Sequence, residues 1–365
     1  MANITSKRSD TNGSEPLYRQ IEAHIRRQIE TGELRPGDPL PSNRILCDQF
    51  GGVNHLTVRQ ALKRLTEAKL VHSIQGKGTF ITPSATCHGR ISFVTPNLID
   101  SLTVRIAEGV QSVLDKQSTH TLILDSRRDV QKEIDNILHL RELPIDGAII
   151  LASPSGSIVE LVVAMKQAGF PFVLVDRYFA EIQTACVVVD NYNGCYQLTQ
   201  HVLRSGRRKF AWLGDLDITA VIDRHQGFRD ALNDAGVSIR RDFIFETHLP
   251  TPTSPSDSEV DAIARKIAQN SAEIDAVICI NDFVALRLMQ TLKSLGIDIP
   301  GQIAVAGFDD IPQAQSSDPP LTSVRQHMEH MGIEAANLLL ERIHTPEAPL
   351  RKIVLPVEVI ARESA

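Results

Sequence analysis

Short apolar runs alternate with helical stretches from residue 90 almost to the end of the chain, and this alternation limits the folds that are available. Continuous apolar strands separated by helices predict parallel sheets that are covered on both faces. The length of the region, about 275 residues, suits two such sheets. The predicted strands are Ile91–Thr95, Thr121–Leu124, Gly147–Leu151, Phe172–Val175, Val187–Val189, Lys209–Leu213, Ala276–Ile280 and Ile303–Ala306. The predicted helices between them include Thr103–Lys116, Ile158–Ala168, Asn191–Arg204 and Phe283–Leu295.

The segment before this region has a different pattern. A first helix is predicted over 17–31, because its apolar residues recur every four positions at Leu17, Ile21, Ile25 and Ile29. Ser42 and Asn54 each stand where a helix N-cap belongs, which predicts two further helices. Two apolar runs then flank Gly76-Lys77-Gly78, as in a β-hairpin. Three helices and a two-stranded wing make a winged helix-turn-helix.

This arrangement predicts contacts with double-stranded DNA. A helix fits the major groove, and the side chains of its first turn reach base edges and phosphates. If Asn54 caps the recognition helix, then Asn54, His55, Thr57 and Arg59 face DNA, whereas Val58, Ala61, Leu62 and Leu65 face the core. Arg44 starts the preceding helix, and Gly76 and Lys77 form the wing tip, which can approach the minor groove. The alternative for Arg59, Lys63 and Arg64 is a solvated helix face.

The phrases "LPSNRILCDQFGGVNHLTVRQALKRL" and "LVHSIQGKGTFI" resemble the gluconate-repressor (GntR) family of bacterial transcription factors over about 66 positions. The resemblance implies DNA contacts at Arg44, Asn54, His55, Thr57, Arg59 and Gly76. His55 stands where the family usually has arginine, and Gly52 is an extra residue in the turn. Both departures leave the operator sequence open.

Charge divides the chain in the same way. Residues 1–83 hold 12 lysine and arginine residues against 8 aspartate and glutamate residues, a net charge of +4. The whole chain has a net charge of −6, so the remaining residues carry −10. A basic head on an acidic body fits a protein that docks on DNA through one module.

Composition excludes several classes of protein. We expect no membrane span and no signal peptide, since no apolar run is long enough and the segment "MANITSKRSDTNGS" has no apolar core. Five cysteines without a CxxC pair indicate reduced thiols in the cytoplasm. Two histidines at 327 and 330 do not specify a metal, and no cofactor is expected. The expected organisation is a disordered leader (1–13), a winged helix-turn-helix (14–83), a linker (84–89) and a two-lobed body (90–365).

The body carries specific phrases of its own. They include "VDR" at 175–177, "VVVDNYNG" at 187–194, "DRHQGFRDALNDAG" at 223–236 and "DPPLTSVRQHMEHMGIEAANLLLERI" at 318–343. These resemble the effector-binding domain of the lactose/galactose-repressor (LacI/GalR) family, which shares its fold with periplasmic sugar-binding proteins. A GntR-type head on a LacI-type body resembles the arabinose-repressor subgroup. The resemblance implies a two-lobed α/β body that binds an effector between its lobes. A homodimer is expected, because paired heads read paired half-sites of DNA.

Polar residues follow several predicted strands, where ligands bind in doubly wound sheets. A carboxylate accepts hydrogen bonds from vicinal hydroxyls and a guanidinium group donates to them, which suits a sugar. By resemblance, Arg224, at the start of its helix, and Asp309 are the first candidates, followed by Asn281 and Asp176. Ser153 and the loop 100–103 are weaker ones. Each carboxylate could instead have a structural role as a cap of a loop or a helix, and we expect this role for Asp282. Arg224 could instead be the ion-pair partner of a carboxylate within the body. Trp212 is expected in the core.

The sequence therefore predicts a cytoplasmic, DNA-binding transcriptional regulator that represses its operator and responds to a sugar-like metabolite. The alternatives are a regulator whose body only dimerises, a transporter's solute-binding protein, and an enzyme. A solute-binding protein needs a signal peptide and no DNA-binding head. An enzyme is not supported, because the sequence lacks three common catalytic motifs: GxGxxG after a first strand, GxxxxGK[ST] and a nucleophile elbow. Pentoses, hexoses, nucleosides and sugar acids all remain possible effectors, and arabinose follows from the subgroup resemblance alone.

Overall fold

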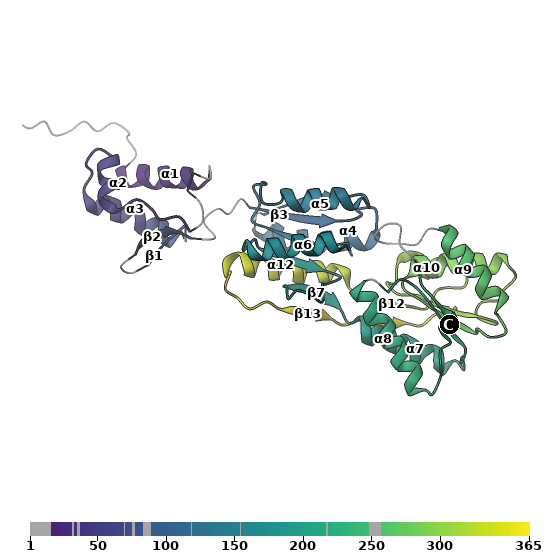
Figure 1. The fold of residues 1–365 in the computed structure, drawn as a ribbon. Helices are drawn as coiled ribbons and strands as arrows, with labels where there is room; N and C mark the ends of the chain where they lie inside the picture. Colours follow the sequence, from purple (N-terminus) through teal and green to yellow (C-terminus); the bar gives the residue numbers. More distant parts are fainter. Residues whose placement is uncertain are drawn as a thin grey trace, which may run out of the picture. The chain divides into compact units, whose positions relative to one another are not determined.

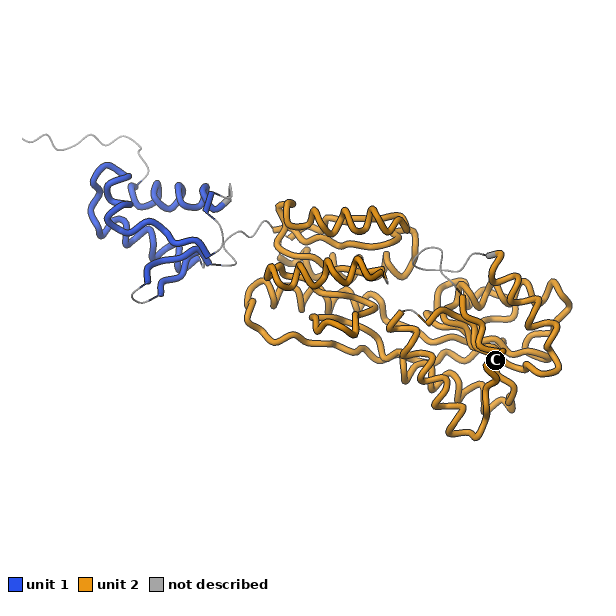
Figure 2. The backbone as a smooth tube through the Cα atoms, in the orientation of Figure 1, with its two compact units in different colours: residues 1–88 blue, residues 89–365 orange. Residues whose placement is uncertain are grey.

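The chain divides into two compact units, residues 1–88 and 89–365 (Figure 2). The structure, a computed structural model, describes residues 16–30, 33–34, 37–68, 70–74, 77–82, 89–117, 119–153, 155–216, 218–247 and 257–365. The expected leader, most of the expected linker and Gly76 lie outside these residues. None of the helices in the described ranges is long and apolar enough to cross a membrane.

The first unit is a winged helix-turn-helix, as predicted (Figure 1). Asn54 caps its third helix by accepting a hydrogen bond from the Leu56 amide at 2.9 Å, and Ser42 caps the second helix in the same way. The wing is an antiparallel pair whose register matches Val71 with Ile81. Its elements are α1 (Leu17–Glu30), α2 (Asn43–Gln49), α3 (His55–Glu67), β1 (Val71–Ile74) and β2 (Gly78–Ile81).

The core of this unit is formed by the apolar stripes of α1 and α3. Ile21, Ile25 and Ile29 of α1 are buried, although Leu17, predicted on the same stripe, is half exposed. The α3 residues predicted to face the core, Val58, Ala61, Leu62 and Leu65, are all buried. The opposite side of α3 is therefore left for a partner.

The second unit contains one large parallel sheet in each lobe and a small antiparallel pair, β12 with β14. The sheet of the first lobe has the strand order β13-β7-β6-β5-β3-β4, and all its pairs are parallel. Residues on both faces are buried: Ile149 and Val173 pack with α4 and α12, whereas Ala148 and Leu174 pack with α5 and α6. The elements are β3 (Arg90–Thr95), α4 (Ser101–Leu114), η1 (Asp115–Gln117), β4 (His120–Asp125), α5 (Val130–His139), β5 (Gly147–Ile150), α6 (Gly156–Gln167), β6 (Phe172–Val175), β7 (Cys186–Val189), α12 (Met328–His344) and β13 (Lys352–Leu355).

The second lobe holds a parallel sheet with the order β11-β10-β8-β9. The pair α7 and α8 lies on one side of it and the pair α9 and α10 on the other (Figure 1). Trp212 of β8 is fully buried, as expected for a core residue. The elements are α7 (Asn191–Arg204), β8 (Phe210–Leu213), α8 (Thr219–Asp234), η2 (Arg241–Phe243), β9 (Ile244–Phe245), α9 (Asp257–Gln269), β10 (Ala276–Cys279), α10 (Asp282–Ser294), β11 (Ala304–Ala306), α11 (Pro312–Ser316), β12 (Ser323–Arg325) and β14 (Glu358–Ile360).

The chain passes between the lobes at three places, near residues 190, 327 and 356. All eight predicted strands are present, with ends that differ by one residue at most. The prediction omitted four strands: β9, β12, β13 and β14. β13 adds to the first sheet beside β7, although almost all of the second lobe separates them in sequence.

Candidate functional site

The first candidate site is the exposed face at the start of α3. His55 and Arg59 are exposed there, and Thr57 is half-buried. The His55 ring nitrogen lies 3.3 Å from the Asn43 side-chain amide, which links the starts of α2 and α3. The structure thus brings the predicted DNA-contact residues of the two helices onto neighbouring surfaces. Arg44 in α2 and Lys77 in the wing are exposed as well.

Arg64, although it lies on the same helix, has an internal partner. Its Nε donates to Glu22 Oε2 of α1 at 2.7 Å, and Arg26 donates to the other oxygen of the same carboxylate. Glu22 is buried, which raises its pKa, but the bonds from Arg64 and Arg26 reverse this effect and hold the pKa below its ordinary value. Arg64 therefore pairs with a carboxylate of α1, a role that neither DNA contact nor a solvated helix face had predicted.

The second candidate site is a cleft between the two lobes, with about 830 Å³ of unfilled space including the part open to solvent. Its lining comes from the carboxyl ends of β3, β5 and β6 in one lobe and of β10 and β11 in the other, and from α8. The polar residues of the lining are Asn97, Asp100, Thr103, Asp176, Arg177, Arg224, Asn281, Asp309 and Gln326.

Arg224 and Asp309 meet in the second lobe. Arg224 Nη1 lies 3.7 Å from Asp309 Oδ1, and its guanidinium carbon lies 3.7 Å from the ring centre of Phe308. Nε donates to Asn191 and Nη1 to the carbonyl of Ile280, so Nη2 is the nitrogen without a partner among the described residues. Arg224 lies in the second turn of α8 and not, as predicted, at the start of its helix.

Burial raises the pKa of Asp309 well above its ordinary value, and the positive charge of Arg224 opposes this rise. The Asp309 carboxylate also accepts a hydrogen bond from the Gln326 amide. Its backbone has a φ of 117°, a conformation that costs free energy for any residue but glycine. Asp176, across the cleft, also has a positive φ, of 67°. Strained backbone of this kind clusters at functional sites.

Asp176 forms an ion pair with its neighbour Arg177 at 3.2 Å. Arg177 is 8% exposed, and its Nε and Nη1 are buried with no hydrogen-bond partner among the described residues. Asp100 caps α4, and burial raises the pKa of its carboxyl group. The prediction missed Arg177, although its place directly after Asp176 in "VDR" was a signal that could have revealed it.

Ser153 does not fit the predicted ligand site. It is buried outside the cleft lining, where its amide donates to Glu133 Oε1 at 2.8 Å and its hydroxyl donates to the other oxygen. Glu133 is fully buried, and burial raises its pKa. Ser153 therefore satisfies a buried carboxylate of α5, a role that the sequence around it does not reveal.

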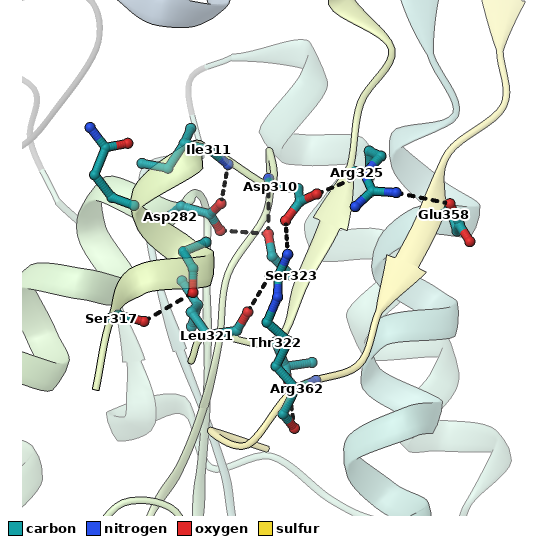
Figure 3. Close-up of polar contacts among 12 residues, drawn as sticks. Asp282, Asp310, Ile311, Ser317, Leu321, Thr322, Ser323, Arg325, Glu358 and Arg362 are labelled. Atoms are coloured by element: carbon teal, nitrogen blue, oxygen red, sulfur yellow. Dashed lines mark hydrogen bonds and ion pairs between the residues drawn. The ribbon is translucent and has the colours of Figure 1, made fainter. Parts of the chain in front are cut away.

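A network of polar contacts surrounds Asp310, the residue after Asp309 (Figure 3). Asp310 accepts from Arg325 at 2.7 Å and from Arg362 at 2.5 Å, whereas Asp309 points to Arg224. The two neighbouring carboxylates thus have separate partners.

Asp282 belongs to the same network (Figure 3). It is fully buried and accepts from Ser323 Oγ at 2.5 Å and from the Ile311 amide at 2.9 Å. Asp282 thus has the structural role expected of it, as a cap of the loop at Ile311; the N-cap of α10 is Asn281, which accepts from the Val284 amide. Burial raises the pKa of Asp282 to about 7.

Polar contacts also join the two lobes beside the cleft. The Tyr178 amide donates to Thr219 Oγ1 at 3.3 Å, and the same hydroxyl donates to the Tyr178 carbonyl at 2.8 Å. The Tyr178 hydroxyl reaches Asp223 at 3.4 Å, and the Lys352 ammonium group lies 3.5 Å from the centre of the tyrosine ring. Tyr178 follows Arg177, and Asp223 precedes Arg224, so these contacts adjoin the cleft on both sides.

Comparisons with known proteins identify both parts of the chain. Residues 17–81 match the model of bacterial regulatory proteins of the gntR family, and residues 199–365 match the periplasmic binding protein-like domain. The arabinose metabolism transcriptional repressor of Geobacillus stearothermophilus is 27% identical over 96% of this chain and 97% of its own. The transcriptional repressor PurR of Vibrio vulnificus is 31% identical over 71% of this chain and 76% of its own. The chain belongs to the LacI/GalR-type repressors and carries a GntR-family head.

The fold agrees with this family. A LacI family regulator from Enterococcus faecium, solved with bound ribose, is 27% identical, with a TM-score of 0.63 over 75% of this chain and 98% of its own. The protein is thus a DNA-binding transcriptional repressor under the control of a ligand, and it is not an enzyme. The GntR-type head binds operator DNA, and the LacI-type body is the ligand-responsive part.

Proposed function

We propose that the cleft binds a neutral sugar, a pentose in the first instance, and that this binding sets the affinity of the head for its operator. The observation that supports a neutral ligand is the balance of charge in the cleft. Each guanidinium group already has a carboxylate, Arg177 with Asp176 and Arg224 with Asp309, and Asp100 adds a third acid. An anionic ligand would meet three carboxyl groups in a partly buried space, which is unfavourable.

The hydrogen-bonding groups also suit a polyol. Carboxylates accept from hydroxyl groups, and the unpaired Nη2 of Arg224 can donate to them. We propose Arg224, Asp309, Asn281 and Asp176 as ligand contacts, and we add Arg177. The names of relatives support a pentose: one is an arabinose repressor, and another was solved with ribose.

On the DNA side, the proposed contacts are exposed at the starts of α2 and α3 and on the wing. They are Arg44, Asn54, His55, Thr57 and Arg59, together with Lys77 and, outside the described residues, Gly76. We propose that the protein acts in the cytoplasm as a dimer, since paired heads read paired half-sites. Closure of the lobes then changes operator affinity through a coupling free energy of about 1–3 kcal/mol.

The ligand is tested by thermal unfolding and calorimetry with arabinose, ribose, the corresponding aldonic acids and the sugar phosphates. A sugar at a hundred times its dissociation constant stabilises the protein by about 2.7 kcal/mol. We expect this stabilisation from a neutral sugar and not from the acid of the same carbon skeleton. Binding of the acid or the phosphate alone would contradict the charge argument. A response to none of these compounds would favour a body that serves only dimerisation.

Two arginines of α8 provide a matched pair. Arg224→Ala should abolish the sugar response and retain operator binding, whereas Arg229→Ala, which changes an exposed residue of the same helix, should retain both. A normal sugar response in Arg224→Ala would remove this residue from the site.

The DNA contacts are tested with Arg59→Ala. If this side chain contacts a base, the free energy of operator binding should weaken by about 1–3 kcal/mol. If it contacts a phosphate, the slope of the logarithm of affinity against the logarithm of salt concentration should decrease in magnitude by about one. The stabilisation by sugar should not change. Unaltered affinity and salt dependence would show that α3 does not face DNA in this way.

A further inference from the structure

The DNA-facing side of α3 contains one exposed apolar side chain, Leu56. It is 67% exposed, more than any other large apolar residue in the described part of the first unit. It lies in the first turn of the helix, and its amide donates to the cap Asn54 at 2.9 Å, which fixes its backbone. Leu56 therefore occupies a defined position at the end of the helix that would enter the major groove.

The core of the first unit does not account for this residue. The buried face of α3 is formed by Val58, Ala61, Leu62 and Leu65. The hydrophobic staple at the start of a helix pairs the residues before the cap and four after it, which are Val53 and Val58 here, and both belong to the core cluster. Leu56 instead heads a stripe at positions i, i+3, i+4 and i+7. Its members are Leu56, Arg59, Gln60 and Lys63, all exposed.

The polar members of this stripe can donate hydrogen bonds to bases and phosphates, but a leucine side chain cannot. In the major groove, thymine is distinguished from the other unmodified bases by an apolar group, the C5 methyl. An apolar side chain in the first turn of a recognition helix gains free energy by covering that methyl. Opposite cytosine it would meet only the C5–H, beside an amino group that it leaves without a partner.

We propose that Leu56 is a specificity-determining residue that reads the methyl group of a thymine in each operator half-site. This inference rests on the proposed placement of α3 in the major groove. The neighbouring polar side chains then read the flanking bases, and Leu56 accounts for one T·A pair that hydrogen bonding alone would not select.

The test uses the full chain and begins with selection of its operator from random duplexes. Each thymine of the selected site is then replaced by deoxyuridine, which pairs in the same way and lacks the methyl group. Since a buried methylene-sized group contributes ~0.8 kcal/mol, one replacement in each half-site should weaken binding about fourfold per contact. In Leu56→Ala, the same replacement should change binding little. Leu17→Ala, which removes an exposed leucine at the start of α1, should respond to uracil as the unaltered chain does.

Each result has a clear consequence. A uracil effect that is present in the unaltered chain and in Leu17→Ala but absent in Leu56→Ala supports the proposal. Equal binding of thymine and uracil sites by the unaltered chain overturns it. A uracil effect that persists in Leu56→Ala overturns it too, because another side chain then reads the methyl. Failure to select any duplex would instead contradict the DNA-binding role. The proposal that Leu56 contacts a thymine would then fail as well.

Discussion

Helices α4 and α12 of the first lobe pack backbone against backbone, and Gly109 makes this contact possible. A Cβ atom built on Gly109 would lie 2.0 Å from the carbonyl oxygen of Glu329 and 3.0 Å from the amide nitrogen of Ile333. Both atoms belong to the backbone of α12, so no side-chain rotation relieves the clash. Gly109→Ala therefore requires the two helices to move apart by more than about 1 Å, given ordinary van der Waals separations.

The expected loss of stability follows from two opposing effects. Overpacking of a tight core costs about 1–3 kcal/mol, and the upper end applies when backbone must move. Alanine recovers up to about 1 kcal/mol through its higher helix propensity. The net loss of about 2 kcal/mol should lower the melting temperature of the body by roughly 4 °C, since larger domains show smaller shifts. Unfolding is followed by far-ultraviolet circular dichroism.

The matched control is Gly156→Ala at the start of α6, where a Cβ atom would meet nothing within 4 Å. Its melting temperature should stay close to that of the unaltered chain. Asp100 caps α4 and Thr103 lies in its first turn, both at the cleft, so displacement of α4 should also weaken sugar binding. Equal melting temperatures for the variants at Gly109 and Gly156 would refute the reasoning about helix packing.

Three further variants test other contacts. Arg64→Ala should lower the denaturant midpoint of the DNA-binding head only slightly, because its pair with Glu22 is partly exposed and screened. Asp282→Asn should flatten the pH dependence of unfolding. The raised pKa of Asp282 gives a stabilisation that is fully present below pH 4 and lost as pH rises through about 7. Thr219→Val removes two hydrogen bonds to Tyr178 across the lobes, and calorimetry should find sugar affinity reduced about tenfold, at about 1.4 kcal/mol for the pair.

Much of the fold could be predicted from local pattern. The caps Ser42 and Asn54 and the buried face of α3 depend on residues within one helical turn, and these predictions are confirmed. The central strands are continuous apolar runs and were equally clear. β13 and β14 were not, because they have exposed residues and gain their pairing from strands far away in sequence.

The site was less predictable, because the same residue types serve as ligand contacts and as internal partners. Ser153 and Asp282 both follow strands, as ligand residues do, yet each satisfies a buried group that another segment supplies. Glu133 and Ile311 are those partners, and neither lies close enough in sequence to be paired by pattern. Arg177 was missed for a different reason. That two of its nitrogens are buried without a hydrogen-bond partner among the described residues becomes visible only in the folded structure.

The geometry of the two cleft carboxylates bears on how a ligand would act. The amide of Asp176 donates to the carbonyl of Val187 in β7, and the amide of Asp309 donates to the carbonyl of Val324 in β12. Each positive-φ residue is thus anchored to a neighbouring strand of its own lobe, which maintains the strained backbone. A ligand held by both carboxylates therefore acts on two rigid lobes and not on mobile loops. In the proposed function, its binding free energy is expressed as a change in the angle between the lobes, and the contacts of Tyr178 with Thr219 favour the closed arrangement.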